Sequence, residues 1–145
     1  MLTIAFVWIH VLSVVLWFGG SALMAFVVGP ALAAAGGAAQ PALSMIATKS
    51  HRYYGATAGV AILSGLFLAW TEGRFSSPLV LTAIALAIFL AFWGSLVTGK
   101  RADALARAGD RERPAAVSSM IQAGTIEITA FFVAFTLMIA VRFGY

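Results

Sequence analysis

The sequence contains no cysteine and few charged residues, and both shortages narrow the range of possible functions. Without thiols the chain can form neither disulfides nor thiolate metal sites, and cysteine redox chemistry is excluded. Charged residues make up 10% of the 145 residues, whereas a soluble domain carries about 25%. Hydrophobic residues reach 62%, and this balance is typical of a protein that lies in a lipid bilayer.

The motifs of common hydrolases and transferases are also missing from the sequence. It has no phosphate-binding loop, no HExxH zinc motif and no Ser/His/Asp set. The net charge of +4 would suit nucleic acid, but most basic residues lie in one connector beside Asp103, Asp110 and Glu112. We therefore expect no nucleic-acid partner.

The sequence does contain four long apolar runs, over residues 2–28, 53–70, 78–98 and 117–141. Each run is long enough to cross about 30 Å of hydrocarbon as a helix. Their length and their lack of alternation exclude a transmembrane barrel. The sequence predicts one transmembrane domain over residues 1–145, an all-α, up-and-down four-helix bundle with a basic cytoplasmic loop at 99–115.

The basic residues predict how the bundle is oriented. Only Arg74 and Arg142 lie on one side, and the other seven of the nine lie in the first and third connectors: Lys49, Arg52, Lys100, Arg101, Arg107, Arg111 and Arg113. The positive-inside rule then places both termini on the outer side. We expect a multi-pass protein of a bacterial-type inner membrane.

The two ends of the first run suggest a retained helix followed by a turn. The run is longer than the apolar part of a signal peptide, which has about 7–15 residues, and no basic residue precedes it. We expect the Ala/Gly-rich residues 31–40 to form a flexible turn. Residues 41–50 are expected to form a short helix at the membrane interface.

Glu127 is the only carboxylate in the four apolar runs. Burying an ionisable group at bilayer depth costs a few kcal/mol or more, so such a residue usually has a function. Ala123, Ala130 and Ala134 share its helical face, and small residues let helices approach closely. We expect Glu127 to point into a helix contact and not toward lipid.

Polar residues also recur along the other three runs. In the first run they form one stripe at three- and four-residue spacing: His10, Ser13, Trp17, Gly20 or Ser21, and Met24. The second run begins with a stripe of His51, Tyr54, Gly55, Ala58 and Ala61. The third run offers Thr82, Trp93, Ser95 and Thr98.

The depths of these residues favour one pairing over another. At about 1.5 Å per residue, His10 lies roughly 12 Å from the outer end of its helix and Glu127 roughly 15 Å from the cytoplasmic end. His51 falls at the cytoplasmic mouth. These depths disfavour a haem clamp made by His10 and His51, and they favour a His10–Glu127 pair near the midplane. The open alternative is a neutral, protonated Glu127 that hydrogen-bonds Ser13, Thr129 or a backbone carbonyl.

Two motifs carry a family resemblance. The run His10-VLSVVLW-Phe18-Gly19-Gly20, followed by Val27-Val28-Gly29-Pro30, resembles the first helix of CopD-like copper-resistance proteins and of HemJ-like protoporphyrinogen oxidases. The run Arg52-Tyr53-Tyr54-Gly55 resembles the start of their second helix. The resemblance covers about half of the chain. It implies that His10 is a haem or metal ligand and that Trp17, Gly19 and Gly20 pack around it.

Three functional hypotheses follow. The first is a protein that binds haem b or a transition metal through His10, with Glu127, Trp17 and Ser13 at the site and His51 as a further metal candidate. Its partners would be a quinone, another membrane protein or a second protomer in a homodimer. The second is a proton- or cation-coupled transporter in which Glu127 titrates and His10 relays. The third is a structural or assembly subunit without chemistry.

Overall fold

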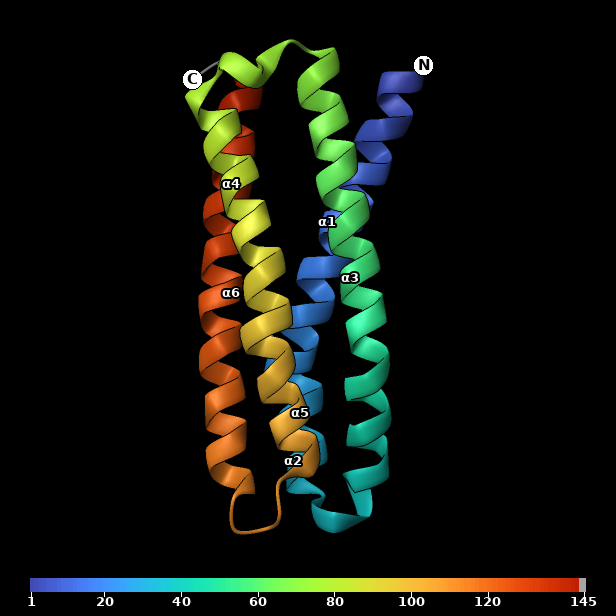
Figure 1. The fold of residues 1–145 in the computed structure, drawn as a ribbon, viewed down its shortest axis with the longest axis vertical. Helices are drawn as coiled ribbons and strands as arrows, with labels where there is room; N and C mark the ends of the chain where they lie inside the picture. The colour runs from blue at the N-terminus through green and yellow to red at the C-terminus, as the bar shows by residue number, and fades with distance from the viewer. Residues whose placement is uncertain (144–145) are drawn as a thin grey trace.

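The computed structural model describes residues 1–143, except for the side chain of Arg142, and forms a bundle of four long helical rods (Figure 1). The first rod comprises α1 (Leu2–Leu23), a π-helical segment (Met24–Val28) and α2 (Gly29–Ala34). The second is α3 (Gln40–Thr71). The third comprises α4 (Pro78–Trp93), a second π-helical segment (Gly94–Thr98) and α5 (Gly99–Arg107). The fourth is α6 (Arg113–Arg142).

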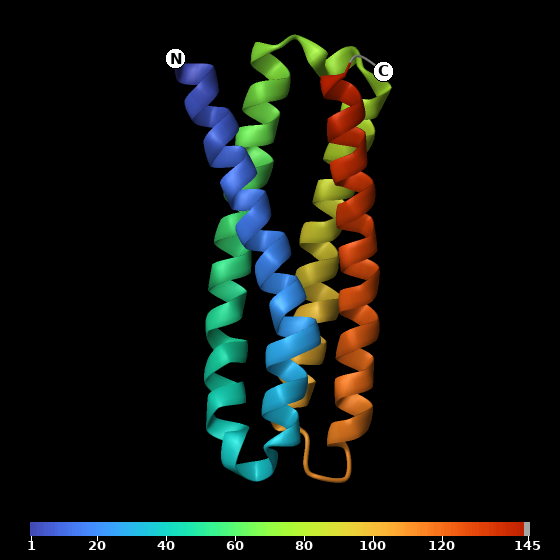
Figure 2. The ribbon, with the colours of Figure 1, turned by 180° about the vertical axis from the view of Figure 1, so that it is seen from behind.

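Each rod is long and apolar enough to cross a membrane, so the chain is a multi-pass membrane protein. Short 3-10 helical turns (Gly36–Ala39 and Arg74–Ser76) connect the first three rods. Both chain termini and the α3–α4 connection lie at one end, which we call the terminal end (Figures 1 and 2). The other end, with the α2–α3 and α5–α6 connections, is the loop end. The predicted all-α four-helix bundle is confirmed.

The rods extend beyond the predicted apolar runs at the loop end. Residues 99–107 were predicted to be loop but form α5, and only residues 108–112 separate α5 from α6. The reason is amphipathicity, since Leu105 and Ala106 are buried while the charged side of α5 stays outside. Residues 31–40 are likewise helical for most of their length, and α3 begins at Gln40, with Pro41 in its first turn.

The interior of the bundle is built largely from small residues, whereas large apolar side chains cover its outside. Alanine dominates the buried hydrophobic residues, and Leu12, Leu63, Phe92 and Phe132 are examples of exposed ones. This pattern suits lipid, where helices associate through close approach of small residues. At the loop end Leu43, Leu105 and Met120 form one core cluster. A second cluster forms around Trp17, Leu90 and Phe131 in the middle of the bundle.

Candidate functional site

Glu127 lies at the centre of the bundle. It is the fifteenth of the thirty residues of α6, counted from Arg113, and its exposed fraction is 1%. Small residues on the same face allow this position, because Gly124 of α6 lies against Ala25 of the first rod with no room for a Cβ atom. The prediction that Glu127 points into a helix contact is confirmed.

Two hydroxyl groups bind the Glu127 carboxylate from two different rods. The Thr98 hydroxyl donates a hydrogen bond of 2.7 Å to Oε2, and the Ser21 hydroxyl donates one of 3.0 Å to Oε1. Hydrogen bonds that involve a charged partner are stronger than neutral ones, and they offset part of the cost of burial. The predicted alternative of hydroxyl partners was right in kind, but Ser13 and Thr129 are not the residues that bind Glu127.

The hydroxyls of Ser21 and Thr98 are used differently from other hydroxyls in the rods. Thr82, Thr125 and Thr129 each donate to the backbone carbonyl four residues earlier, as helical threonines commonly do. By contrast, Ser21 and Thr98 donate to the carboxylate. The first and third rods therefore each supply one side-chain donor to Glu127.

Both of these residues are adjacent to the π-helical segments. Ser21 lies three residues before Met24–Val28, and Thr98 is the last residue of Gly94–Thr98. In each segment the next glycine donates its N–H to the carbonyl five residues earlier, from Gly29 to Met24 and from Gly99 to Gly94. Such one-turn π segments are rare and occur often at functional sites. Two of them meet one buried carboxylate here.

A cavity of about 350 Å³ extends from Glu127 toward the loop end, and we call it the loop-end cavity. Trp17 and Tyr54 contribute aromatic side chains to its wall. The Tyr54 ring lies against α1 because Gly20 has no side chain there, and a Cβ at Gly20 would sit 3.1 Å from that ring. At the edge of the cavity the exposed His51 on α3 pairs with Asp103 on α5 at 3.3 Å.

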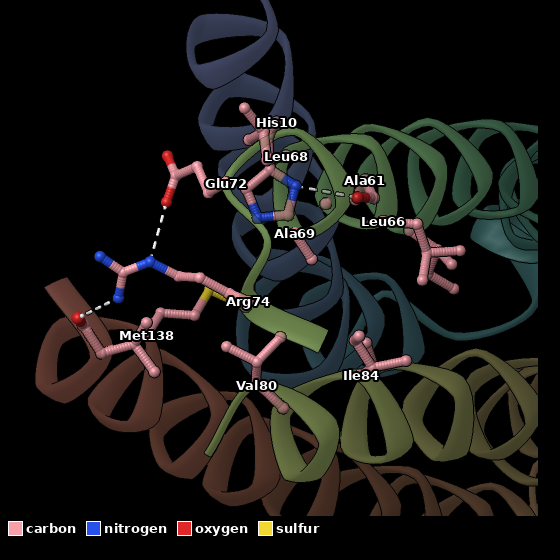
Figure 3. A pocket seen from close by; sticks show the side chains of 15 residues that line it. His10, Ala61, Leu66, Leu68, Ala69, Glu72, Arg74, Val80, Ile84 and Met138 are labelled. Atoms are coloured by element: carbon pink, nitrogen blue, oxygen red, sulfur yellow. Dashed lines mark hydrogen bonds and ion pairs between the residues drawn. The ribbon is translucent and has the colours of Figure 1, made fainter. Parts of the chain in front are cut away.

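A second cavity, of about 220 Å³, lies at the terminal end and contains His10 (Figure 3). His10 Nδ1 lies 2.8 Å from the carbonyl oxygen of Ala61, and a carbonyl can only accept, so Nδ1 is the donor. The imidazole packs on Gly65, where a Cβ would be 2.9 Å from Cε1. Arg74 and Glu72 form an ion pair of 3.1 Å near the rim, and Arg74 also donates to the Val141 carbonyl.

An apolar plug lies between Glu127 and the terminal end of the bundle. It consists of Trp17, Leu90 and Phe131, which line a small third cavity of about 30 Å³. The rings of Trp17 and Phe131 are in edge-to-face contact, with centroids 4.8 Å apart. The third cavity shares His10 with the terminal-end cavity and Trp17 with the loop-end cavity. All three cavities also share Ile62, so they are adjacent to one another within the bundle.

The predicted His10–Glu127 pair is wrong. Glu127 is bound by Ser21, which lies eleven residues beyond His10 on the first rod, or roughly 16 Å along the helix axis. His10 instead bonds to Ala61 of α3. The prediction failed because it took the rods to end where their apolar runs end. The first rod continues to Ala34 instead of ending at residue 28, so the loop end lies farther from His10 than the apolar runs predict.

The remaining candidate residues are dispersed. His51 lies at the loop end, far from His10, which agrees with the prediction against a haem clamp by the two histidines. Ser13 is buried on α1 but does not line the loop-end cavity. Within residues 1–143 no three His, Asp or Glu side chains come close enough together to hold a metal ion. Sequence reasoning noted Thr98, Ser21 and Tyr54 but did not assign them to Glu127.

Comparisons with known proteins add no further assignment. No family model matches the sequence, no curated protein matches it significantly, and no solved structure matches the fold significantly. The resemblance to CopD-like and HemJ-like proteins stays a prediction from the motifs of the first two rods.

Proposed function

We propose that the protein is a proton- or cation-coupled permeation protein in which Glu127 is the ion-carrying group. The observation that supports this proposal is a fully buried carboxylate at the inner end of one cavity, with an apolar plug between it and the terminal end. A carboxylate kept at bilayer depth is a usual element of ion and proton pathways.

The arrangement of cavities suits access from one side at a time. Glu127 shares the loop-end cavity with Tyr54 and His51, whereas Trp17, Leu90 and Phe131 lie between it and the terminal end. Passage requires that the plug side chains move apart. The π-helical segments beside Ser21 and Thr98 offer places where the first and third rods can bend without breaking.

We further propose that the loop end faces the cytoplasm and both termini face the outside of a bacterial-type inner membrane. Lys49 and Arg52, the four basic residues of α5 and the connector that follows it, and Arg113 at the start of α6 lie at the loop end, which supports this orientation. Arg74 lies at the terminal end. The side chain of Arg142 lies outside the described part of the chain.

A haem bound between His10 and Glu127 does not fit the residues present. The two side chains are bound to different partners in different cavities, and the charged groups near His10, Glu72 and Arg74, pair with each other. A metal or haem held by His10 alone, with a ligand from another molecule, would require its second ligand to reach the terminal-end cavity. An absorption spectrum and a metal analysis of the purified protein test this alternative directly.

Proton flux into proteoliposomes tests the proposed function. Under an imposed pH gradient, wild-type protein should carry protons that a trapped pH-sensitive dye reports. Glu127→Gln should abolish this flux, because an amide cannot exchange a proton, and Glu127→Asp should retain part of it. Thr129→Val is the matched control, since Thr129 is an exposed residue of the same helix that bonds only to its own backbone. Unchanged flux in Glu127→Gln would overturn the proposal.

A further inference from the structure

We infer that the loop-end cavity binds an organic cation, an ammonium group with apolar substituents, against the Glu127 carboxylate. The inference rests on the proposed function, because it names the cargo that shares Glu127 with the proton. It is carried by the charge of the cavity wall, by its size and by its aromatic side chains.

The charge of the cavity wall favours a cation. Glu127 is the only carboxylate among the described residues that line the loop-end cavity, and neither lysine nor arginine is among them. Among the described residues that line this cavity, the side chain that can carry a positive charge is that of His51. It is exposed at the edge of the cavity and already pairs with Asp103. An anion entering the cavity would meet an acidic group with no basic group to balance it.

The size and lining of the cavity favour an organic cation over an inorganic one. A cavity of about 350 Å³ falls within the range of small-molecule sites, about 300–1,000 Å³. Most of the wall is apolar, with Ala58, Ala91 and Met120 among its residues. A bare metal ion would need several oxygen ligands in place of its water shell. Within the described chain Glu127 is the single carboxylate that lines this cavity.

Two aromatic side chains complete the site. Trp17 and Tyr54 lie in the same wall as Glu127. Aromatic faces attract ammonium groups through their negative electrostatic potential, and this attraction grows when water is excluded. Gly20 positions the Tyr54 ring, and Phe131 holds the Trp17 ring edge to face. The aromatic groups are therefore fixed before a ligand enters.

Binding to one carboxylate couples the cation to the proton. Glu127 can hold either a proton or an ammonium group, so binding of the cation should weaken as the pH falls. The other titratable groups that face the cavity are Tyr54 and His51 from α3, with Asp103 of α5 paired to His51. From the first rod Ser21 reaches the carboxylate but does not titrate.

Calorimetry on the purified full-length protein in detergent tests the inference, with tetraethylammonium chloride as the probe. This cation carries no exchangeable proton, so its binding reports charge and apolar contact alone. We expect saturable one-site binding that strengthens as the pH rises. Glu127→Gln should weaken it by more than about tenfold, the equivalent of 1.4 kcal/mol, and Thr129→Val should leave it unchanged.

Further measurements keep the two proposals separable. Potassium chloride at the same concentrations should give no comparable heat, and equal or stronger potassium binding would overturn the inference in favour of an inorganic ion. If tetraethylammonium does not bind while Glu127-dependent proton flux persists, the cargo is wrong and the proposed function stands. If neither is seen, both fail. Trp17→Leu, with Glu127 intact, should weaken binding while the circular-dichroism spectrum stays helical, which separates loss of a contact from loss of the fold.

Discussion

In the loop-end half of the bundle, buried charged side chains bond to side chains of other rods, whereas in the terminal-end half the buried polar side chains bond mainly to backbone. Arg113 is 7% exposed, and it donates to Gln40 and to the Ala108 carbonyl. Gln40 in turn donates to the carbonyl of Ala106. At the terminal end, His10 bonds to the Ala61 carbonyl, and the Arg74–Glu72 pair is exposed.

The loop-end half thus holds charged groups in its interior, whereas the terminal-end half keeps its charged pair at the surface. Buried polar groups that bond to one another are costly to assemble and specify one arrangement. The loop-end half contains such groups around Glu127 and between Glu127 and the α5–α6 connection. The cavity of the terminal-end half is apolar apart from His10 and the charged residues at its rim. A transport cycle would then change the terminal-end half more than the loop-end half.

The largest expected effect comes from comparing the proton flux of two variants, each with one ionisable residue replaced in one half of the bundle. Glu127→Gln should abolish proton flux in proteoliposomes, because no other carboxylate lines the loop-end cavity in the described chain. His10→Gln should reduce flux only in part, since the amide can still donate a hydrogen bond to the Ala61 carbonyl. Equal losses in the two variants would remove the distinction between the halves.

Arg113→Ala tests whether the buried network stabilises the loop end. The substitution removes hydrogen bonds to Gln40 and Ala108 and an ion pair to the exposed Asp110, and it leaves the buried Ala108 carbonyl without this donor. We expect a loss of about 2–4 kcal/mol in the free energy of unfolding. Arg111→Ala, an exposed neighbour, is the control and should cost less than about 0.5 kcal/mol. Denaturation followed by circular dichroism measures both.

Gly65→Ala tests the packing of His10 in the terminal-end half. A Cβ at position 65 would lie 2.9 Å from Cε1 of the imidazole, so the ring must shift and its bond to Ala61 must lengthen. We expect destabilisation by about 1–2 kcal/mol. Gly59→Ala on the same helix is the matched control, because no atom lies within 4 Å of its Cβ. A helix gains stability from either alanine, so the difference between the variants isolates the clash.

Thr98→Val should produce the smallest effect, a loss of about 1 kcal/mol in stability. The valine keeps the shape of the side chain and removes the 2.7 Å hydrogen bond to Glu127. Thr129→Val, which removes a bond to the helix's own backbone, should be nearly neutral. If both variants unfold alike, the hydroxyl at position 98 does not hold the carboxylate.

The sequence predicted the class of fold well and the site only in part. Long apolar runs impose helices in lipid, and small residues around Glu127 imply that it faces inward; both statements follow from local pattern. The partners of Glu127 depend on the rotational phase of the first and third rods, that is, on the direction in which each side chain points around the helix axis. That phase changes at the π-helical segments, for which the sequence offers only local signs: Gly29 and Pro30 after the first, and Gly94 and Gly99 at the ends of the second. The predicted His10–Glu127 pair was wrong because the sequence did not show where the helical rods end.

The first π-helical segment has a consequence for insertions and deletions. The π turn holds one residue more than an α-helical turn. Because an α-helix turns by 100° per residue, the same sequence wound as a regular α-helix through Met24–Val28 would rotate α2 by about that angle relative to α1. Gly29, which now lies against the methyl group of Met120, would face another direction, and the loop-end core would lose its fit. Removing one residue from Met24–Val28 would therefore permit regular winding with α2 left in place, whereas the present sequence needs the π turn to keep Gly29 against Met120.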